Sequence, residues 1–300
     1  MILTKLNNLE QYKGLTKLKA NNASIKKALE NNYIVKTNAQ AHIVNNILSL
    51  EEEYQNNKLI DKIDLKGNSK LGEIPSISFP NIFIQQQFMI LCINNPKILE
   101  LKSVSILHDY FKENKICLNC ENCFGACYNN YDINQYPQKA ISDLRALLAF
   151  ITDKESLLDS LYKRIRVYNI FRINSNGEIH NIELLDFYIR LANKCKRTTF
   201  YTYTKSYELF NSYIENGNKL PKNFILNISV FENKNKVEKF FNLTSTFNKF
   251  VTMVNDELDQ LIKTGKVKKN RVCKGDCMEC DLCQKNLPKK NNTIYCYKHL

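Results

Sequence analysis

Apolar and polar residues alternate along the second half of the chain with the periods of strands and helices in turn. Runs rich in β-branched and aromatic residues predict strands, and the segments between them carry apolar residues at the spacing of one helix face. Strand centres about 26–30 residues apart match right-handed βαβ units. Strands are expected at 166–173, 199–204 and 224–230, and helices at 182–194 and 207–216.

This alternation predicts an α/β fold with parallel strands, arranged either as an open sheet or as a partial or full (β/α) barrel. In both architectures ligands bind at the carboxyl ends of the strands, so a site is expected in the loops after Ile173, Thr204 and Val230. We expect three parts along the chain: an N-terminal helical region at 1–65, a barrel-like α/β domain with a cysteine loop at 66–262, and a basic, cysteine-rich metal-binding module at 263–300.

The first half of the chain carries weaker signals. Residues 1–65 are polar with amphipathic stretches and predict a helical cap on the main domain, although 22–49 also fits a small helix-turn-helix. Strand-like sequence is expected within 70–93. Pro137 is typical of a helix start and predicts one helix, followed by a second at 154–163.

Length and composition indicate a folded protein with no membrane partner. The chain has 300 residues, of which 44% are hydrophobic, which favours a sizeable core over intrinsic disorder. Its longest apolar run is Phe88–Ile93, whereas a membrane helix needs about 20 apolar residues. The N-terminal sequence lacks the apolar stretch and cleavage site of a secretory signal, so we expect a cytoplasmic location.

Cysteine is the most informative residue type. Eight of the 11 cysteines fall in two short runs, at 117–127 and 273–283. Disulfide scaffolds are typical of small secreted chains, and thiols this close converge on one point more readily than they form separate disulfides. The two runs therefore predict thiolate ligands in a reducing cytoplasm. The isolated Cys92 and Cys195 are expected to be ordinary buried thiols.

The first run has the spacing C-x2-C-x2-C-x3-C of bacterial ferredoxins, without the proline that follows it there. Thiolates this close can surround three corners of a cubane cluster, whereas zinc usually takes two C-x2-C pairs that are far apart in sequence. We expect a 4Fe–4S cluster here, with zinc as the alternative. Its ligands would be Cys117, Cys120, Cys123 and Cys127.

The second run is equally crowded and fits a second iron–sulfur cluster as well as a structural zinc ion. Its ligands would be Cys273, Cys277, Cys280 and Cys283, with Cys296 and His299 within reach.

The chain carries a net charge of +13, and residues 263–300 hold ten Lys and Arg against three Asp and Glu. Such a segment could contact nucleic acid phosphates, with Tyr295 and Tyr297 stacking on bases. A solvated, Lys-rich surface explains the same charge equally well. Nucleic acid is therefore one expected partner, but the charge alone does not require it.

Several motifs follow one another over residues 68–300. They are KLGEIPSISFP at 70–80, a cysteine loop ending in Cys-Tyr, RINSNGEI at 172–179, FYTYTKS at 200–206, NFILNISV at 223–230, and CKGDCMECDLC at 273–283 with His299. This order resembles the phage-associated Gene product 88 family, which itself resembles radical-SAM-like iron–sulfur proteins. The resemblance implies a (β/α) barrel-like fold and iron–sulfur chemistry, without a defined reaction.

A protein of radical-SAM type holds its cluster on three cysteines, here Cys120, Cys123 and Cys127, and leaves the fourth iron open for S-adenosylmethionine. The usual spacing of such proteins, C-x3-C-x2-C, occurs in the first run only in reversed order, so Cys117 could replace one of the three. The candidate cofactor-binding residues lie on predicted strands or just after them, where a carboxylate could bind a ribose hydroxyl and an arginine a carboxylate; they are Arg172, Gly177, Glu178, Tyr203 and Lys205. A surface turn at NSNG and aromatic core filling are the structural alternatives for these positions.

The sequence leads to two functional hypotheses. The first is an iron–sulfur protein of radical-SAM type, phage or mobile-element derived, that acts on a nucleic acid base or nucleotide through catalytic residues not yet identified. The second is a non-enzymatic zinc or iron–sulfur protein that binds nucleic acid or interferes with a host protein. No Walker A, G-x-G-x-x-G, G-x-S-x-G or H-E-x-x-H sequence occurs, which argues against nucleotide hydrolysis, classical dinucleotide binding and metalloprotease chemistry.

Overall fold

A six-stranded parallel β-sheet forms the centre of the fold, and its strands lie in the order β1-β2-β3-β4-β5-β6. The computed structural model describes residues 27–28, 30–66, 71–117, 136–230 and 239–297. The strands are β1 (Ser76–Ile77), β2 (Ile170–Ile173), β3 (Thr199–Thr204), β4 (Phe224–Val230), β5 (Asn248–Met253) and β6 (Thr293–Tyr297). This confirms the predicted α/β class with parallel strands. A barrel is not shown, because β1 and β6 form the two ends of the order.

Helices connect successive strands of this sheet. Because each strand pairs with its neighbour in the sequence and the connections between parallel strands are right-handed, the connecting helices lie on the same face. The alternation of side chains supports this arrangement, since Phe200 and Leu226 join the large core under the helices while Tyr201 and Ile225 join a separate cluster on the other face. The connecting helices are α8 (Ile182–Lys194), α9 (Tyr207–Glu215), α11 (Phe241–Thr246) and α12 (Asn255–Lys263).

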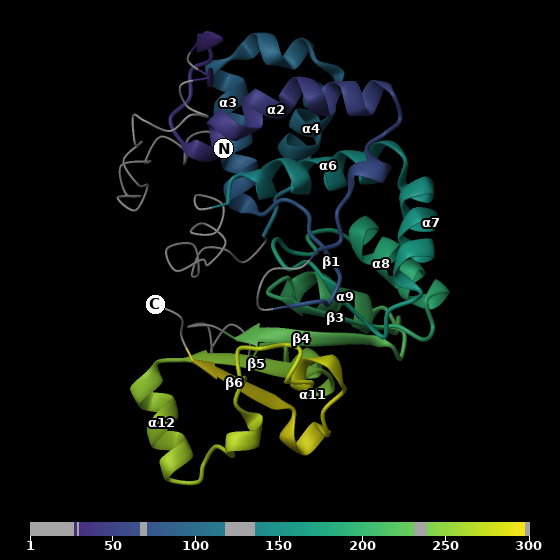
Figure 1. Cartoon of the computed structure of the whole chain (residues 1–300). Helices are drawn as coiled ribbons and strands as arrows, with labels where there is room; N and C mark the ends of the chain where they lie inside the picture. Colours follow the sequence, from purple (N-terminus) through teal and green to yellow (C-terminus); the bar gives the residue numbers. More distant parts are fainter. Residues whose placement is uncertain (1–26, 29, 67–70, 118–135, 231–238, 298–300) are drawn as a thin grey trace.

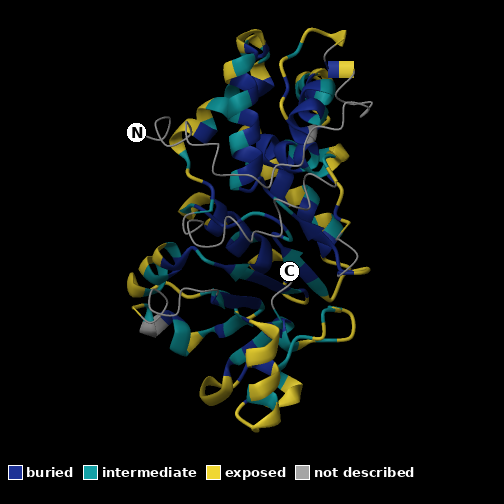
Figure 2. Cartoon of the chain, turned by 90° about the vertical axis from the view of Figure 1, so that its left-hand side faces the viewer, coloured by how far each residue is buried: buried dark blue, intermediate teal, exposed yellow. Residues whose placement is uncertain are grey.

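A second group of helices precedes β2 in the chain. Figure 1 shows α2, α3, α4 and α6 at one end of the molecule and β4, β5, β6 and α12 at the other. Buried residues continue from the helical end into the sheet (Figure 2), so the two parts share one core. These helices are α2 (Asn38–Gln55), α3 (Ile82–Asn94), α4 (Lys102–Glu113), α6 (Gln138–Thr152) and α7 (Lys154–Ile165).

The strand-like prediction for 70–93 is wrong beyond β1. The Asn81 side chain accepts a hydrogen bond from the Ile84 amide at 2.9 Å and caps helix α3, which continues to Asn94. Short apolar runs fit a buried helix as well as a strand, and the asparagine cap favours the helix. In the predicted helical region, residues 1–26 and 29 lie outside the described residues.

The segment after α12 passes over the face of the sheet opposite the helices before it continues into β6. It contains the short 3-10 helices η6 (Lys269–Arg271), η7 (Leu282–Gln284) and η8 (Lys289–Asn291). Val272 forms a parallel bridge with Tyr295 of β6, and η7 lies against β3 and β4. Among the described residues, no helix combines the length and the apolar character needed to cross a bilayer.

Candidate functional site

The loop that follows β2 packs against the segment after β1. The Asn176 amide donates to the Ser78 hydroxyl at 3.0 Å, and the hydroxyls of Ser78 and Ser175 lie 2.8 Å apart. Gly177 has a φ of +74°, and a Cβ atom there would lie 2.4 Å from the carbonyl oxygen of Phe79. This close approach requires glycine, and it directs the next residue inward.

Glu178 turns into the protein, where 7% of it is exposed. Its Oε1 atom accepts hydrogen bonds from the Thr204 hydroxyl at 2.9 Å and the Ile179 amide at 3.0 Å, and its Oε2 atom accepts one from the Lys205 amide at 2.7 Å. Burial raises the pKa of Glu178 to about 7, although these hydrogen bonds act in the opposite direction. The predicted residues Gly177, Glu178 and Lys205 therefore meet at the carboxyl ends of β2 and β3.

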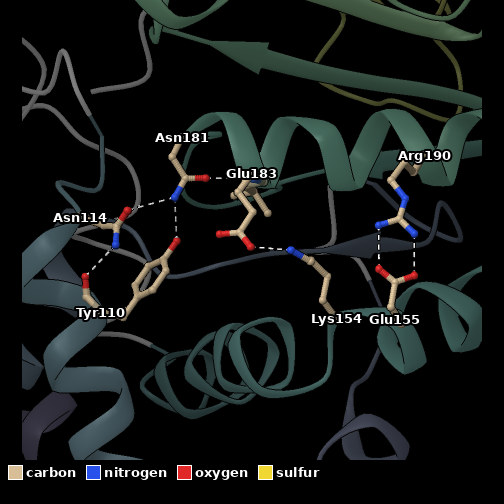
Figure 3. Close-up of polar contacts among 8 residues, drawn as sticks. Tyr110, Asn114, Lys154, Glu155, Asn181, Glu183 and Arg190 are labelled. Carbon is tan, nitrogen blue, oxygen red and sulfur yellow. Dashed lines mark hydrogen bonds and ion pairs between the residues drawn. The ribbon is translucent and has the colours of Figure 1, made fainter.

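A polar network that the sequence did not predict holds this loop against α4, and Figure 3 shows its part around Asn181, Tyr110 and Asn114. His180 Nδ1 lies 3.2 Å from the Glu178 carbonyl, and His180 Nε2 lies 2.8 Å from the Tyr110 hydroxyl. That hydroxyl also accepts a hydrogen bond from the Asn181 side chain, which donates a second one to Asn114. Burial lowers the pKa of His180 to about 4, so the imidazole is neutral near pH 7.

The opposite face of the sheet carries Cys273, Cys277, Cys280 and Cys283, the C-terminal cysteine group. Buried amides attach this segment to the strands: Asn227 Nδ2 donates to the Cys283 carbonyl at 3.0 Å, and Asn248 Nδ2 donates to the Lys285 carbonyl at 2.9 Å. The sequence contained one sign of this role: Asn227 is a polar residue inside the apolar strand FILNISV. A buried amide needs hydrogen-bond partners, so a polar contact could have been expected there.

The thiols of this group lie beside one another and beside two tyrosines. The Tyr203 hydroxyl is within hydrogen-bonding reach of Cys283. The nearby thiols of Cys273 and Cys280 both raise the pKa of Cys283. Burial raises the pKa of Cys283 to about 12, and Tyr203 acts to lower it. The Tyr201 hydroxyl faces Cys277 without a hydrogen bond of full geometry. In the part of the chain that is described, no three candidate ligands have the geometry of a metal site, so metal binding stays a prediction.

Arg172 lies against the same group. Its guanidinium carbon is 4.1 Å from the ring centroid of Tyr203 and 5.1 Å from that of Tyr201. The five residues predicted to bind one cofactor therefore occupy two places: Arg172 and Tyr203 are near the C-terminal cysteine group, and the other three are in the loop around Glu178.

The remaining predicted ligands are spread over the chain. Cys117 packs against the large core, and Cys296 is buried in β6. Cys120, Cys123, Cys127 and His299 lie outside the described residues. Cys92 and Cys195 are buried, as predicted, and burial raises their pKa values to about 12 and about 11.

Two surface features complete the picture. Tyr297 is half-buried, and its hydroxyl donates to Asp259 of α12 at 2.6 Å. An open groove of about 480 Å³ lies between α8 and α9, where Ile182 and Leu209 line it together with Glu183, Asp186 and Tyr213. None of the predicted ligands that the structure describes lines this groove.

Comparison with families of known proteins matches residues 55–286 to the family described as Gene product 88. The match includes both the loop around Glu178 and the C-terminal cysteine group. No curated protein and no solved structure matches the chain.

Proposed function

The chain belongs to the phage-associated Gene product 88 family, and from that membership we propose that it is an iron–sulfur protein of radical-SAM type. The observation that carries the proposal is the packing of Cys273, Cys277 and Cys283 with two tyrosines on one face of the parallel sheet, with Cys280 close enough to affect Cys283. Thiolates are the ligands that iron–sulfur clusters and structural zinc ions share, so the chemistry of this donor set fits either group.

The strand order supports a barrel-type architecture for this proposal. Six parallel strands in sequential order, with helices on one face, match an arc of a (β/α) barrel. The first cysteine run falls in the connection from β1 to β2, where Cys120, Cys123 and Cys127, with Cys117 as a substitute, would hold the catalytic cluster. When bound, such a cluster supplies the electron that cleaves S-adenosylmethionine.

The loop around Glu178 would bind the cofactor in this scheme. Gly177 brings the backbone close to its neighbours, and the Glu178 carboxylate could accept a hydrogen bond from a ribose hydroxyl. The C-terminal cysteine group, with Cys296 and His299 nearby in the sequence, would hold an auxiliary cluster or a zinc ion. The net charge of +13 supports a nucleic acid base or nucleotide as the substrate.

A second candidate function is a non-enzymatic metal protein that binds nucleic acid or a host protein. One observation favours it: the Glu178 carboxylate already accepts three hydrogen bonds from its own chain. An arriving hydroxyl would have to displace one of these donors, which is typical of a structural carboxylate rather than of a ligand-binding one.

Anaerobic purification followed by iron, sulfide and zinc analysis distinguishes the two. We expect iron and sulfide in the full chain, and slow release of 5′-deoxyadenosine when the reduced protein is incubated with S-adenosylmethionine. Cys123→Ser and Cys127→Ser should each abolish that release, whereas Cys92→Ser, at an isolated buried thiol, should retain it. Colourless protein with stoichiometric zinc and no 5′-deoxyadenosine would contradict the first function and support the second.

A further inference from the structure

Arg172 places a positive charge on the face of the sheet that carries the C-terminal cysteine group. Its Nη1 atom is buried and has no hydrogen-bond partner among the described residues. A guanidinium stays protonated in proteins, and a buried charge without a partner costs free energy. The apolar neighbours on this face include Ile74, Ile170 and Ile225. The position therefore calls for a negative group.

Two tyrosine rings fix the guanidinium in place. It lies 4.1 Å from the ring centroid of Tyr203 and 5.1 Å from that of Tyr201, distances at which a cation interacts favourably with the ring. Phe250 holds Tyr203 in turn, with an edge contact of 4.7 Å between ring centroids. These contacts hold the guanidinium beside the two tyrosines, and the Arg172 side chain is only partly exposed.

The hydroxyls of the same two rings face sulfur atoms. The Tyr203 hydroxyl is within hydrogen-bonding reach of Cys283. Tyr201 has no exposed surface, and its hydroxyl, which faces Cys277, lacks a hydrogen bond of full geometry. A cation and two hydroxyl donors thus surround the C-terminal cysteine group, and all three suit thiolates better than neutral thiols.

We propose that Arg172, Tyr201 and Tyr203 form a cationic support for an anionic metal–thiolate complex held by the C-terminal cysteine group. Four thiolates together carry more negative charge than a divalent cation or an iron–sulfur core carries positive charge. Either complex is therefore an anion, and the guanidinium compensates part of its charge. The tyrosine hydroxyls donate to the ligating sulfurs, as outer-shell partners of metal ligands do. This role differs from the cofactor contact that their strand positions predict for Arg172 and Tyr203. It rests on the metal binding of the proposed function.

Cobalt(II) titration of the reduced, metal-free full chain tests the inference, because cobalt–thiolate complexes absorb visible light. We expect Arg172→Gln to weaken cobalt affinity by about 10- to 100-fold, and Arg172→Lys to recover part of the loss. Tyr203→Phe keeps the ring but removes the donor, so it should also weaken binding. The matched control is Arg166→Gln, since Arg166 stacks on Tyr162 at 5.8 Å on the helical side; it should bind cobalt like the wild type.

Unfolding measurements separate charge compensation from packing. In the metal-free protein, Arg172→Gln should leave the midpoint of urea unfolding unchanged or raise it, because it removes a buried charge. In the cobalt-loaded protein the same change should lower the midpoint, whereas a packing role would lower both. Equal cobalt affinity in the wild type, Arg172→Gln and Tyr203→Phe overturns the inference and leaves the proposed function intact. Absence of cobalt–thiolate absorbance in the wild type also overturns it, while the proposed catalytic cluster is judged separately by 5′-deoxyadenosine release.

Discussion

At Gly177 a single hydrogen atom in place of a side chain allows two loops to meet. The backbone has a φ of +74°, and a Cβ atom would lie 2.4 Å from the Phe79 carbonyl oxygen and 3.1 Å from that of Pro80. Both obstacles are backbone atoms, which cannot rotate away as the end of a flexible side chain can. The position of Glu178 therefore depends on the absence of a side chain at the residue before it.

Gly177→Ala is expected to lower the free energy of unfolding by at least about 3 kcal/mol, because backbone strain and a steric clash add together. Gly217→Ala is the matched control: Gly217 has a φ of +80° with no atom within 4 Å of the added Cβ, so it should lose only about 1–2 kcal/mol. Urea unfolding of both variants measures the difference. Similar losses in the two variants would contradict the close contact with Phe79.

Glu178 makes the stability of the protein dependent on pH. Burial raises its pKa from 4.5 to about 7, so its contribution to stability is fully present below pH 4.5 and is lost as pH rises through about 7. At about 1.4 kcal/mol for each pH unit, the change amounts to about 3 kcal/mol. Glu178→Gln removes this titration and should flatten the free energy of unfolding between pH 5 and 8, as measured by urea unfolding.

The control for this measurement is Glu183→Gln, at an exposed position of α8, which should keep the wild-type pH dependence. An identical pH dependence of the free energy of unfolding in Glu178→Gln and the wild type would show that Glu178 does not titrate in this range.

His180 affects stability at lower pH. Its pKa is lowered from 6.5 to about 4, so its contribution to stability is present above pH 6.5 and is lost as pH falls through about 4. Between about pH 4 and 7 both buried groups are neutral.

Ion pairs connect the helices, and their burial differs. Between α2 and α6, Arg145 donates to both carboxylate oxygens of Glu53, with Nη2 and Oε1 3.0 Å apart, and the two side chains are 16% and 12% exposed. Between α7 and α8, Arg190 donates to Glu155 in the same bidentate way, but both side chains are exposed (Figure 3). The same chemistry therefore occurs in two environments.

Glu53→Gln is expected to destabilise the protein by about 3 kcal/mol, because it leaves Arg145 as a partly buried charge without its counter-ion. Glu155→Gln should cause no measurable change in stability, since water solvates both members of the Glu155–Arg190 pair. Thermal unfolding of the two variants under the same buffer conditions provides the comparison. Equal effects of the two substitutions would contradict a role for burial.

Individual elements were predictable where periodicity and capping agreed. Helix α8 has the predicted bounds because its apolar face is continuous and Asn181 caps its start, accepting a hydrogen bond from the Leu184 amide at 2.9 Å. Strands β3 and β4 also match their predicted bounds. Helix α3 was missed because its apolar residues flank three consecutive glutamines without the periodicity of a helix, which would distinguish it from a strand.

On the scale of the whole molecule, the parallel sheet and its connecting helices were predictable, because each βαβ unit is local in sequence. The spacing of the second cysteine run predicts a metal site, and this stays a prediction. The place of the run on the sheet was not predictable, since it depends on Asn227, which contacts Cys283 56 residues away. The two places occupied by Arg172 and Glu178 likewise follow from strand register and loop geometry rather than from sequence spacing.

The amide bridge at Asn227 has a consequence for the order in which the chain folds. Asn227 donates to the Thr202 carbonyl of β3 and the Cys283 carbonyl, and Asn248 donates to Asn227 and the Lys285 carbonyl. These acceptors and donors face one another only after β3, β4 and β5 have paired. These hydrogen bonds therefore require the paired strands, and we expect the cysteine segment to dock after the sheet has formed.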